Sequence, residues 1–380
     1  MVRHNKFAAP RVRTAIVAVA LMASGMTAAV ATSQSASAVG PVDQLVVADV
    51  SSATSSALSA TSLLTFNTSG SASFAAPVPL PTADSGSDKA FTLSGSSNGN
   101  GSLALSANSN FLSIAGYNHI PGPTGFVDAT NAPIEPKSTT ASQINRMVAR
   151  VSATGTVDTS TVLGTGLLNG SAPRSAVSND GTSFYISGNG GNIGETAASG
   201  VDQVALGAST GTAIAPTTQK NVRQVQIAGG GLYLTSDKKN LFGLGKFAVA
   251  GLPTVASTAI TQLAATSTAT NNVQPGALLM LHTGASGSAI DTAYVVIDST
   301  SLVPADPVKG TPELPPVAGE IRKYTLSGGI WSLNGTKAGD YPFLTGRVNT
   351  AGTAVQLYAA NGNDSGNTLV SFDDSGLAGA

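Results

Sequence analysis

The chain has 380 residues, and its 19 lysines and arginines nearly balance its 20 aspartates and glutamates, at a formal net charge of −1. After the first 38 residues the cations are scattered, and Lys238-Lys239 and Arg322-Lys323 are their only adjacent pairs, so we expect no binding to nucleic acid. The sequence contains no cysteine, which excludes disulfides, thiolate catalysis and cysteine-ligated zinc. Charged residues make up only 10% of the chain, and apolar alternation recurs along it, which favours a folded β-protein over a disordered one.

The first 38 residues have the pattern of a secretory signal peptide. A basic segment up to Arg13 precedes the apolar stretch 15–23, and small residues then lead to the A-x-A site Ala36–Ala38. We expect cleavage after Ala38 and secretion of residues 39–380 as a mildly acidic chain. The alternative, an uncleaved membrane anchor, is disfavoured because Ser24 interrupts the run before it reaches the ~20 apolar residues that a span needs.

Strand signals follow the signal segment, and helical patterning is nearly absent. Apolar runs separated by turn residues predict strands at 44–50, 62–66, 90–94, 147–152 and 157–163. The last two are joined through Thr154-Gly155, which is the pattern of a hairpin. Proline-rich segments are expected to connect strands rather than to form them, because proline cannot donate to a β-ladder.

The clearest hairpin surrounds Asn179-Asp180-Gly181, which separates the apolar runs 175–178 and 182–187. Asparagine and aspartate tolerate turn conformations, and glycine supplies a positive φ. Further strands are predicted at 201–206, 222–227, 231–235, 278–282, 320–326 and 329–333.

Five short apolar runs carry a tyrosine and then pass into Gly, Ser, Asn or Asp. Their tyrosines are Tyr117, Tyr185, Tyr233, Tyr294 and Tyr358. They lie roughly 50 to 70 residues apart, a spacing typical of the blades of a toroidal β-protein. The chain is therefore interpreted as a repeat architecture.

Three of these units resemble the blade strands of secreted bacterial β-propellers: Ser-Asn-Asp-Gly-Thr-Ser-Phe-Tyr-Ile-Ser-Gly, Gly-Gly-Gly-Leu-Tyr-Leu-Thr-Ser and Gly-Glu-Ile-Arg-Lys-Tyr-Thr-Leu-Ser-Gly-Gly-Ile-Trp. The resemblance covers roughly residues 42–375 and is one of rhythm, since neither a WD repeat nor a regular kelch double glycine is present. It implies a platform and says little about the ligand.

We therefore predict an all-β fold, a β-propeller of six or seven blades that occupies residues 39–380 as a single domain. The alternative is a pair of tandem β-sandwich domains, divided near Pro304–Pro316.

Four residues are candidates for binding, and none is a candidate for catalysis by motif. The nucleophile elbow Gly-x-Ser-x-Gly has no match, since Gly284–Ser288 misplaces its final glycine. Tyr117 and His119 lie where a strand passes into a loop. Arg174 flanks the Asn-Asp-Gly hairpin and is expected to pair with a carboxylate between blades or to line the channel. Trp331, the only tryptophan, is expected to pack between blades or to stack on a sugar ring.

Export, repeated strands and missing catalytic motifs together predict a secreted, non-enzymatic scaffold that presents loops to a protein or a glycan. The alternative is a secreted hydrolase or lyase on the loop face, with His119 and an aspartate from another blade as acid and base. We expect no cofactor and no metal, because only His119 and His282 follow the signal segment and His282 is expected to pack locally. The sequence predicts no membrane span after cleavage and leaves the oligomeric state open.

Overall fold

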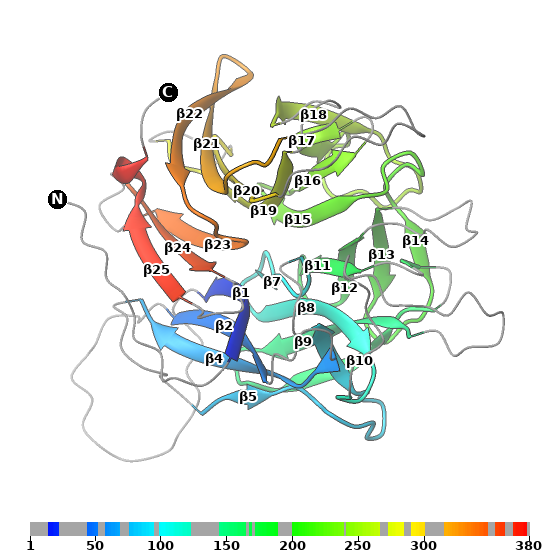
Figure 1. Ribbon diagram of the computed structural model, residues 1–380. Coiled ribbons are helices and arrows are strands. Elements are labelled where there is room, and N and C mark those ends of the chain that lie inside the picture. Colours follow the sequence, from blue (N-terminus) through cyan, green and yellow to red (C-terminus); the bar gives the residue numbers. More distant parts are fainter. Residues whose placement is uncertain are drawn as a thin grey trace, which may run out of the picture.

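The structure is a computed structural model that describes residues 14–22, 44–51, 58–68, 76–94, 99–122, 144–164, 167–168, 172–188, 200–238, 241–266, 273–284, 290–300, 315–348, 354–361 and 368–377. Its strands form six sheets arranged around one axis (Figure 1). The fold is thus an all-β propeller of six blades, as the tyrosine spacing predicts.

The strands of each sheet pair antiparallel, and the chain passes through the blades in order except that β3, which lies between β2 and β4 in the chain, belongs to the second sheet. Blade 1 contains β1 (Thr14–Met22), β2 (Gln44–Ser51), β4 (Thr61–Asn67) and β5 (Val78–Pro79). Blade 2 contains β3 (Leu58–Ser59), β6 (Phe91–Ser94), β7 (Leu103–Leu105), β8 (Phe111–Asn118), β9 (Arg146–Ser152) and β10 (Val157–Val162). Blade 3 contains β11 (Pro173–Ser178), β12 (Ser183–Gly188), β13 (Val201–Ala205) and β14 (Gly211–Ala213).

The second half repeats this plan. Blade 4 contains β15 (Val222–Ala228), β16 (Gly231–Lys238), β17 (Leu241–Phe247) and β18 (Ile260–Ala265). Blade 5 contains β19 (Gln274–Leu281), β20 (Thr292–Asp298), β21 (Glu320–Ser327) and β22 (Ile330–Ala338). Blade 6 contains β23 (Phe343–Val348), β24 (Val355–Asn361) and β25 (Thr368–Asp373), followed by the 3₁₀ turn η1 (Asp374–Gly376).

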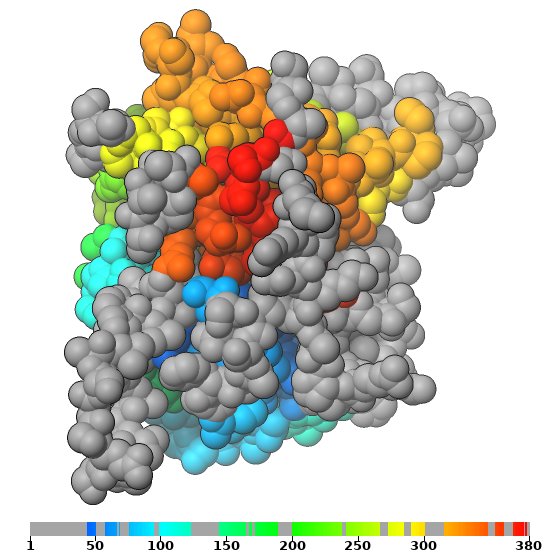
Figure 2. All heavy atoms as spheres, turned by 90° about the vertical axis from the view of Figure 1, so that its left-hand side faces the viewer, coloured from blue at the N-terminus to red at the C-terminus, as the bar shows by residue number. Residues whose placement is uncertain are grey.

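The alternative of two β-sandwich domains is wrong. The predicted division near Pro304–Pro316 falls between β20 and β21, and these two strands pair with each other within blade 5, Thr292–Ile297 against Glu320–Thr325. The ring also closes: the inner strands contact one another in the order β1, β7, β11, β15, β19, β23 and back to β1. Figure 2 shows the last blade, orange to red, lying against the blue first blade.

The five predicted tyrosines occupy the second strand of five blades, namely β8, β12, β16, β20 and β24. All five side chains are buried, and most pack in the apolar clusters that separate neighbouring blades. The tyrosine-bearing segments are thus equivalent members of one circular stack, in which each sheet covers an apolar face of its neighbour.

The predicted hairpin at 179–181 is confirmed between β11 and β12. Gly181 has φ +85°, and a Cβ there would lie 2.4 Å from the Phe111 ring, so both the backbone and the available space require glycine. The Ser178 hydroxyl accepts a hydrogen bond from the Gly181 N–H at 2.7 Å and closes the turn.

Residues 14–22, which overlap the apolar stretch 15–23 of the predicted signal peptide, form β1 and pair with β2. β1 is the inner strand of blade 1 and contacts β7 on one side and β23 on the other. Among the residues that the structure describes, none forms a helix of the length and apolarity that a membrane crossing requires.

Candidate functional site at the mouth of the central channel

The inner strands surround a central channel that contains three cavities in series. The largest, about 230 Å³, lies toward the ends of the strands, and the smallest, about 10 Å³, shares Leu103, Gln224 and Leu344 with it. A third cavity of about 20 Å³ lies where the inner strands begin, and it is lined by Arg174, Arg223 and Asp298 among others. The two ends of the channel therefore differ in chemistry, because charged side chains line the cavity of about 20 Å³ and none is among the residues that line the cavity of about 230 Å³.

Arg174 and Arg223 occupy equivalent positions in neighbouring blades. Each is the second residue of an inner strand and stands three residues before the partner of that blade's tyrosine, since Val177 pairs with Tyr185 and Gln226 with Tyr233. Each also lies where the register of its strand pair shifts, as in a β-bulge. Bulges redirect side chains and are common beside binding sites, so they bring both guanidinium groups to the channel mouth.

Arg223 is held by its neighbours. Its Nη2 lies 3.2 Å from Asp237 Oδ2 on β16 and donates to Gln274 Oε1 on the next blade at 2.5 Å. The Asn221 amide donates a further hydrogen bond to Asp237. The charge of Arg223 is thus balanced by a fixed carboxylate, and the group ties blade 4 to blade 5.

Arg174 has no such partner. Its side chain makes no hydrogen bond to the residues that the structure describes, and its Nε is buried. Burial lowers the pKa of Arg174 to about 9, with Arg223 as the second cause, so the group is cationic at neutral pH. A buried N–H without an acceptor is costly, and an anion at this mouth would satisfy it.

Asp298 is the last residue of β20 and lines the same cavity. A Cβ on Gly276 would lie 2.7 Å from Asp298 Oδ1, so the glycine leaves room for this carboxyl group. Burial raises the pKa of Asp298 to about 6, although Arg223 and Arg174 oppose the change. Among the described residues no hydrogen bond reaches this carboxyl group, so it is available to a ligand.

Tyr117 lies near this cluster, close enough to be among the groups that influence the pKa of Arg174. The tyrosine is fully buried, its hydroxyl accepts a hydrogen bond from the Asn100 amide at 3.1 Å, and the Arg146 guanidinium stands 5.7 Å from its ring. Two of the four predicted binding residues, Tyr117 and Arg174, are thus brought to one end of the channel.

The other two predicted residues lie elsewhere. His119 follows β8, is half-buried, and has its Nδ1 2.6 Å from the Ile120 carbonyl oxygen. Trp331 is on β22, the outer strand of blade 5, and lies half-buried against the apolar cluster of blades 4 and 5 that contains Tyr324. The packing role predicted for Trp331 fits this position, and the sugar-stacking role stays a prediction.

Sequence reasoning missed Arg223, Asp237 and Asp298. A signal for the two aspartates was present: both stand four residues after a repeated tyrosine, as Tyr233-x-x-x-Asp237 and Tyr294-x-x-x-Asp298. Within the described ranges, no group of three or more His, Cys, Asp or Glu side chains is placed to hold a metal ion.

Neither a protein-family model nor a curated protein matches the sequence. Among solved structures, the chain is similar to a candidate 6-phosphogluconolactonase from Bacteroides fragilis, with a TM-score of 0.38, 14% identity, and coverage of 86% of this chain and 82% of that one. It is also similar to a prolyl endopeptidase, with a TM-score of 0.33, 13% identity and 83% of this chain covered. Prolyl oligopeptidase B from Galerina marginata matches over 83% of this chain at 10% identity, with a TM-score of 0.32.

The chain spans only 37% and 45% of the lengths of the two prolyl peptidases. The prediction of a non-enzymatic scaffold is wrong by this comparison, because all three of these neighbours carry the names of enzymes. Likeness at this level of identity shows the fold alone, so the reaction has to be sought in the channel's own residues.

Proposed function

We propose that the chain is a hydrolase that acts at the charged mouth of the propeller channel on a small ester or lactone bearing an acidic group. One observation carries this proposal: two side chains of opposite charge line the same cavity. They are the Asp298 carboxyl, with a pKa of about 6, and the Arg174 guanidinium, which has no acceptor among the described residues.

Asp298 has the properties of a general base. At neutral pH most of it is ionised, and its raised pKa gives it more basicity than an ordinary aspartate. It takes a proton from a water molecule as the water oxygen attacks the carbonyl carbon. The protonated Asp298 then returns that proton to the leaving alkoxide, so that the ester and water become an acid and an alcohol.

Arg174 supplies the specificity for an anion. A substrate carboxylate accepts hydrogen bonds from its guanidinium, and the partly buried position strengthens this charge-assisted contact. Arg223, already balanced by Asp237, adds positive potential and stabilises the oxyanion that forms at the attacked carbonyl. In this proposal Asp298 takes the acid–base role that the sequence analysis gave to His119.

The test is a hydrolysis screen with carboxylate-bearing esters and sugar-acid lactones. Asp298→Asn is expected to lower kcat by about 100-fold or more, and Arg174→Gln to raise KM about tenfold or more through loss of ground-state binding. Asp180→Asn, on the exposed hairpin between β11 and β12, is the matched control. Full activity in Asp298→Asn, or no turnover of any substrate by the native chain, would contradict the proposal.

We also propose that the protein is secreted, on the strength of its leader pattern alone. The intact mass of the exported protein tests this. Loss of residues 1–38 supports cleavage and means that the mature ring closes without β1, whereas a retained leader means that β1 stays in blade 1.

A further inference from the structure

The cavity at the charged mouth has hydrogen-bond donors for which the protein provides no acceptor. The Nε–H groups of Arg174 and Arg223 are both buried, and neither has an acceptor among the described residues. Both arginines line this cavity. A buried donor without an acceptor is costly, and hydrogen bonds from a cationic donor to an anion are the strong ones, so the cavity favours an anion.

The size of the cavity limits which anion it holds. A water molecule needs about 10–15 Å³ of such space, so the volume of about 20 Å³ accommodates one group of the size of water. A halide ion or one end of a carboxylate is of this size, whereas a tetrahedral sulfate or phosphate ion is larger. The geometry therefore selects a small monovalent anion.

The charges on the wall determine when an anion enters. Asp237 balances Arg223 at 3.2 Å, which leaves Arg174 and Asp298 as the remaining charged groups among the residues that line the cavity. While Asp298 is ionised these two charges cancel, and an entering anion meets a carboxylate in the same small space. Once Asp298 carries a proton, the wall keeps the positive charge of Arg174 and gains a hydroxyl donor.

Asp298 is able to take up this proton close to neutral pH. Burial raises its pKa to about 6, although Arg223 and Arg174 lower it in part. The negative charges of Asp340 and Asp237 also raise it. An anion beside Asp298 adds one more negative charge, so anion binding and protonation of this carboxyl group favour each other.

We propose that the charged mouth is a binding site for a small monovalent anion, a halide ion or a carboxylate group, which enters together with a proton taken up by Asp298. By linkage, the affinity for the anion falls as the pH rises above about 6, by up to about tenfold per pH unit when one proton accompanies each anion. One consequence rests on the proposed hydrolase activity: chloride competes with the acidic group of the substrate for Arg174 and inhibits most strongly at acidic pH.

Chloride is the probe, and the broadening of its chlorine NMR line by the native protein measures binding at constant ionic strength. We expect saturable binding at about pH 5.5 that weakens about tenfold or more by about pH 7.5. Formate, which is also a monovalent anion, is expected to displace chloride. Sulfate at the same ionic strength is expected to leave it bound.

Variants test the two charged groups separately. Arg174→Gln removes the unbalanced positive charge and is expected to weaken chloride binding at least about tenfold. Asp298→Asn puts a neutral group of the same shape in place of the protonated carboxyl. It is expected to bind chloride equally well at both pH values, and more tightly than the native protein at the higher one. Asp180→Asn, on the exposed hairpin, is the control and keeps the native pH dependence.

The proposal is overturned if the native protein shows no saturable broadening, or if its affinity for chloride is the same at the two pH values. It is also overturned if folded Arg174→Gln binds chloride as well as the native protein does, or if Asp298→Asn keeps the native pH dependence. Should Arg174→Gln fail to fold, Asp298→Asn and the displacement by formate still decide. None of these measurements requires turnover, so failure of the hydrolase screen leaves the anion site intact, and absence of chloride binding beside normal turnover overturns the anion site alone.

Discussion

Neighbours from two different blades and from its own blade give Asp298 its chemical character. Gly276, on the paired strand β19, leaves space for the carboxyl group. The positive charges of Arg223 and Arg174 lower a pKa that burial has raised. Because these arginines belong to blades 4 and 3, their effect on the carboxyl group arises only when the blades are assembled.

Gly276→Ala is expected to impair activity with little loss of folding. The new methyl group would stand 2.7 Å from Asp298 Oδ1, closer than a non-bonded contact allows, so the carboxyl group has to move. We expect kcat/KM to fall about tenfold or more, as misplacement of a reacting group does. Gly122→Ala is the control, because its new methyl group would meet no atom nearer than 3.8 Å. Native kinetics in Gly276→Ala would show that Asp298 is not the base.

The pH dependence of the reaction tests the link between Arg174 and Asp298. A base with a pKa of about 6 predicts that kcat/KM falls as the pH drops below about 6. Arg174 lowers the pKa of Asp298, so Arg174→Gln is expected to move this acidic limb to higher pH. If the acidic limb does not move in Arg174→Gln, Arg174 does not influence the pKa of the base.

At this scale the sequence predicts part of the site. Tyr117 stands out because a strand passes into a loop there, and Arg174 because it flanks the Asn-Asp-Gly hairpin. Asp298 does not stand out, because its raised pKa depends on burial and on charges from other blades, and neither leaves a local pattern.

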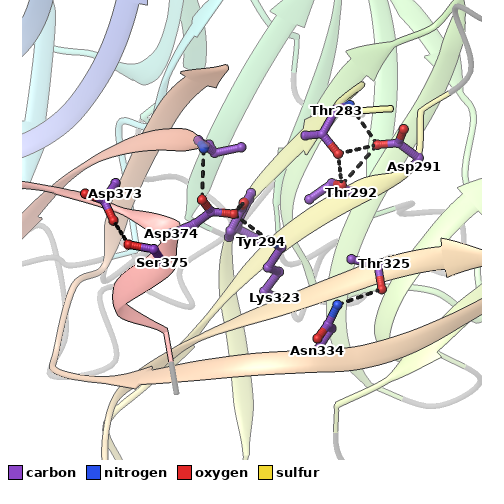
Figure 3. Close-up of polar contacts among 11 residues, drawn as sticks. Thr283, Asp291, Thr292, Tyr294, Lys323, Thr325, Asn334, Asp373, Asp374 and Ser375 are labelled. Atoms are coloured by element: carbon purple, nitrogen blue, oxygen red, sulfur yellow. Dashed lines mark hydrogen bonds and ion pairs between the residues drawn. The ribbon is translucent and has the colours of Figure 1, made fainter. Parts of the chain in front are cut away.

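Among the elements, η1 connects blades 5 and 6 through one aspartate. Asp374 Oδ2 accepts from the Tyr294 hydroxyl at 2.9 Å and lies 2.5 Å from Lys323 Nζ, while its Oδ1 accepts from the Val355 N–H at 2.9 Å (Figure 3). The Asp374 side chain is only 9% exposed. A short 3₁₀ turn thus completes the packing of a blade that has three described strands.

Asp374→Ala is expected to destabilise the protein by about 3 kcal/mol, because it leaves a partly buried lysine and a buried tyrosine hydroxyl without their acceptor. Denaturant unfolding measures the change. Asp373→Ala is the adjacent control, since Asp373 is exposed and bonds only to Ser375 among the described residues (Figure 3). Equal effects of the two substitutions would contradict this account of η1.

Strand positions are well predicted where tyrosine, glycine and alternation coincide, as at 183–188 and 231–235. β1 is not predicted as a strand, because its apolar composition after a basic head also satisfies the requirements of a signal peptide. An uninterrupted apolar run has no periodicity that distinguishes a buried strand from the apolar centre of a signal peptide.

At the scale of the whole molecule, the sequence does not decide whether the propeller has six or seven blades. Blade 1 has no tyrosine in its second strand, β2, and blade 6 has only three described strands. The ring is closed instead by apolar packing, in which Leu45 and Val47 share a cluster with Tyr358 and Leu369. Contacts between the two ends of a chain leave no mark in local sequence.

The stability of the whole propeller is expected to depend on pH through Asp202. This residue is 1% exposed on β13, and burial raises its pKa to about 7 from 3.8, against a hydrogen bond from the Leu168 N–H. Between these pH values the folded state binds more protons than the unfolded state, so stability falls as the pH rises, by at most about 4 kcal/mol.

Asp202→Asn is expected to flatten this dependence between pH 4 and 7 in denaturant titrations. Asp180→Asn is the control, because hydrogen bonds from Thr182 lower the pKa of Asp180 and confine its titration to more acidic pH. An unchanged slope in Asp202→Asn would place the titrating group elsewhere.

The motif Tyr-x-x-x-Asp is present in two adjacent blades with two different outcomes. In blade 4, Asp237 forms an ion pair with Arg223. In blade 5, Gly276 on the facing strand leaves room for Asp298, which forms no such pair among the described residues. Repetition of a structural unit thus provides a second aspartate at an equivalent position, while the first already secures the scaffold. The second aspartate is free to acquire reactivity, and a designer could use the same division of labour to introduce new chemistry into a repeat protein.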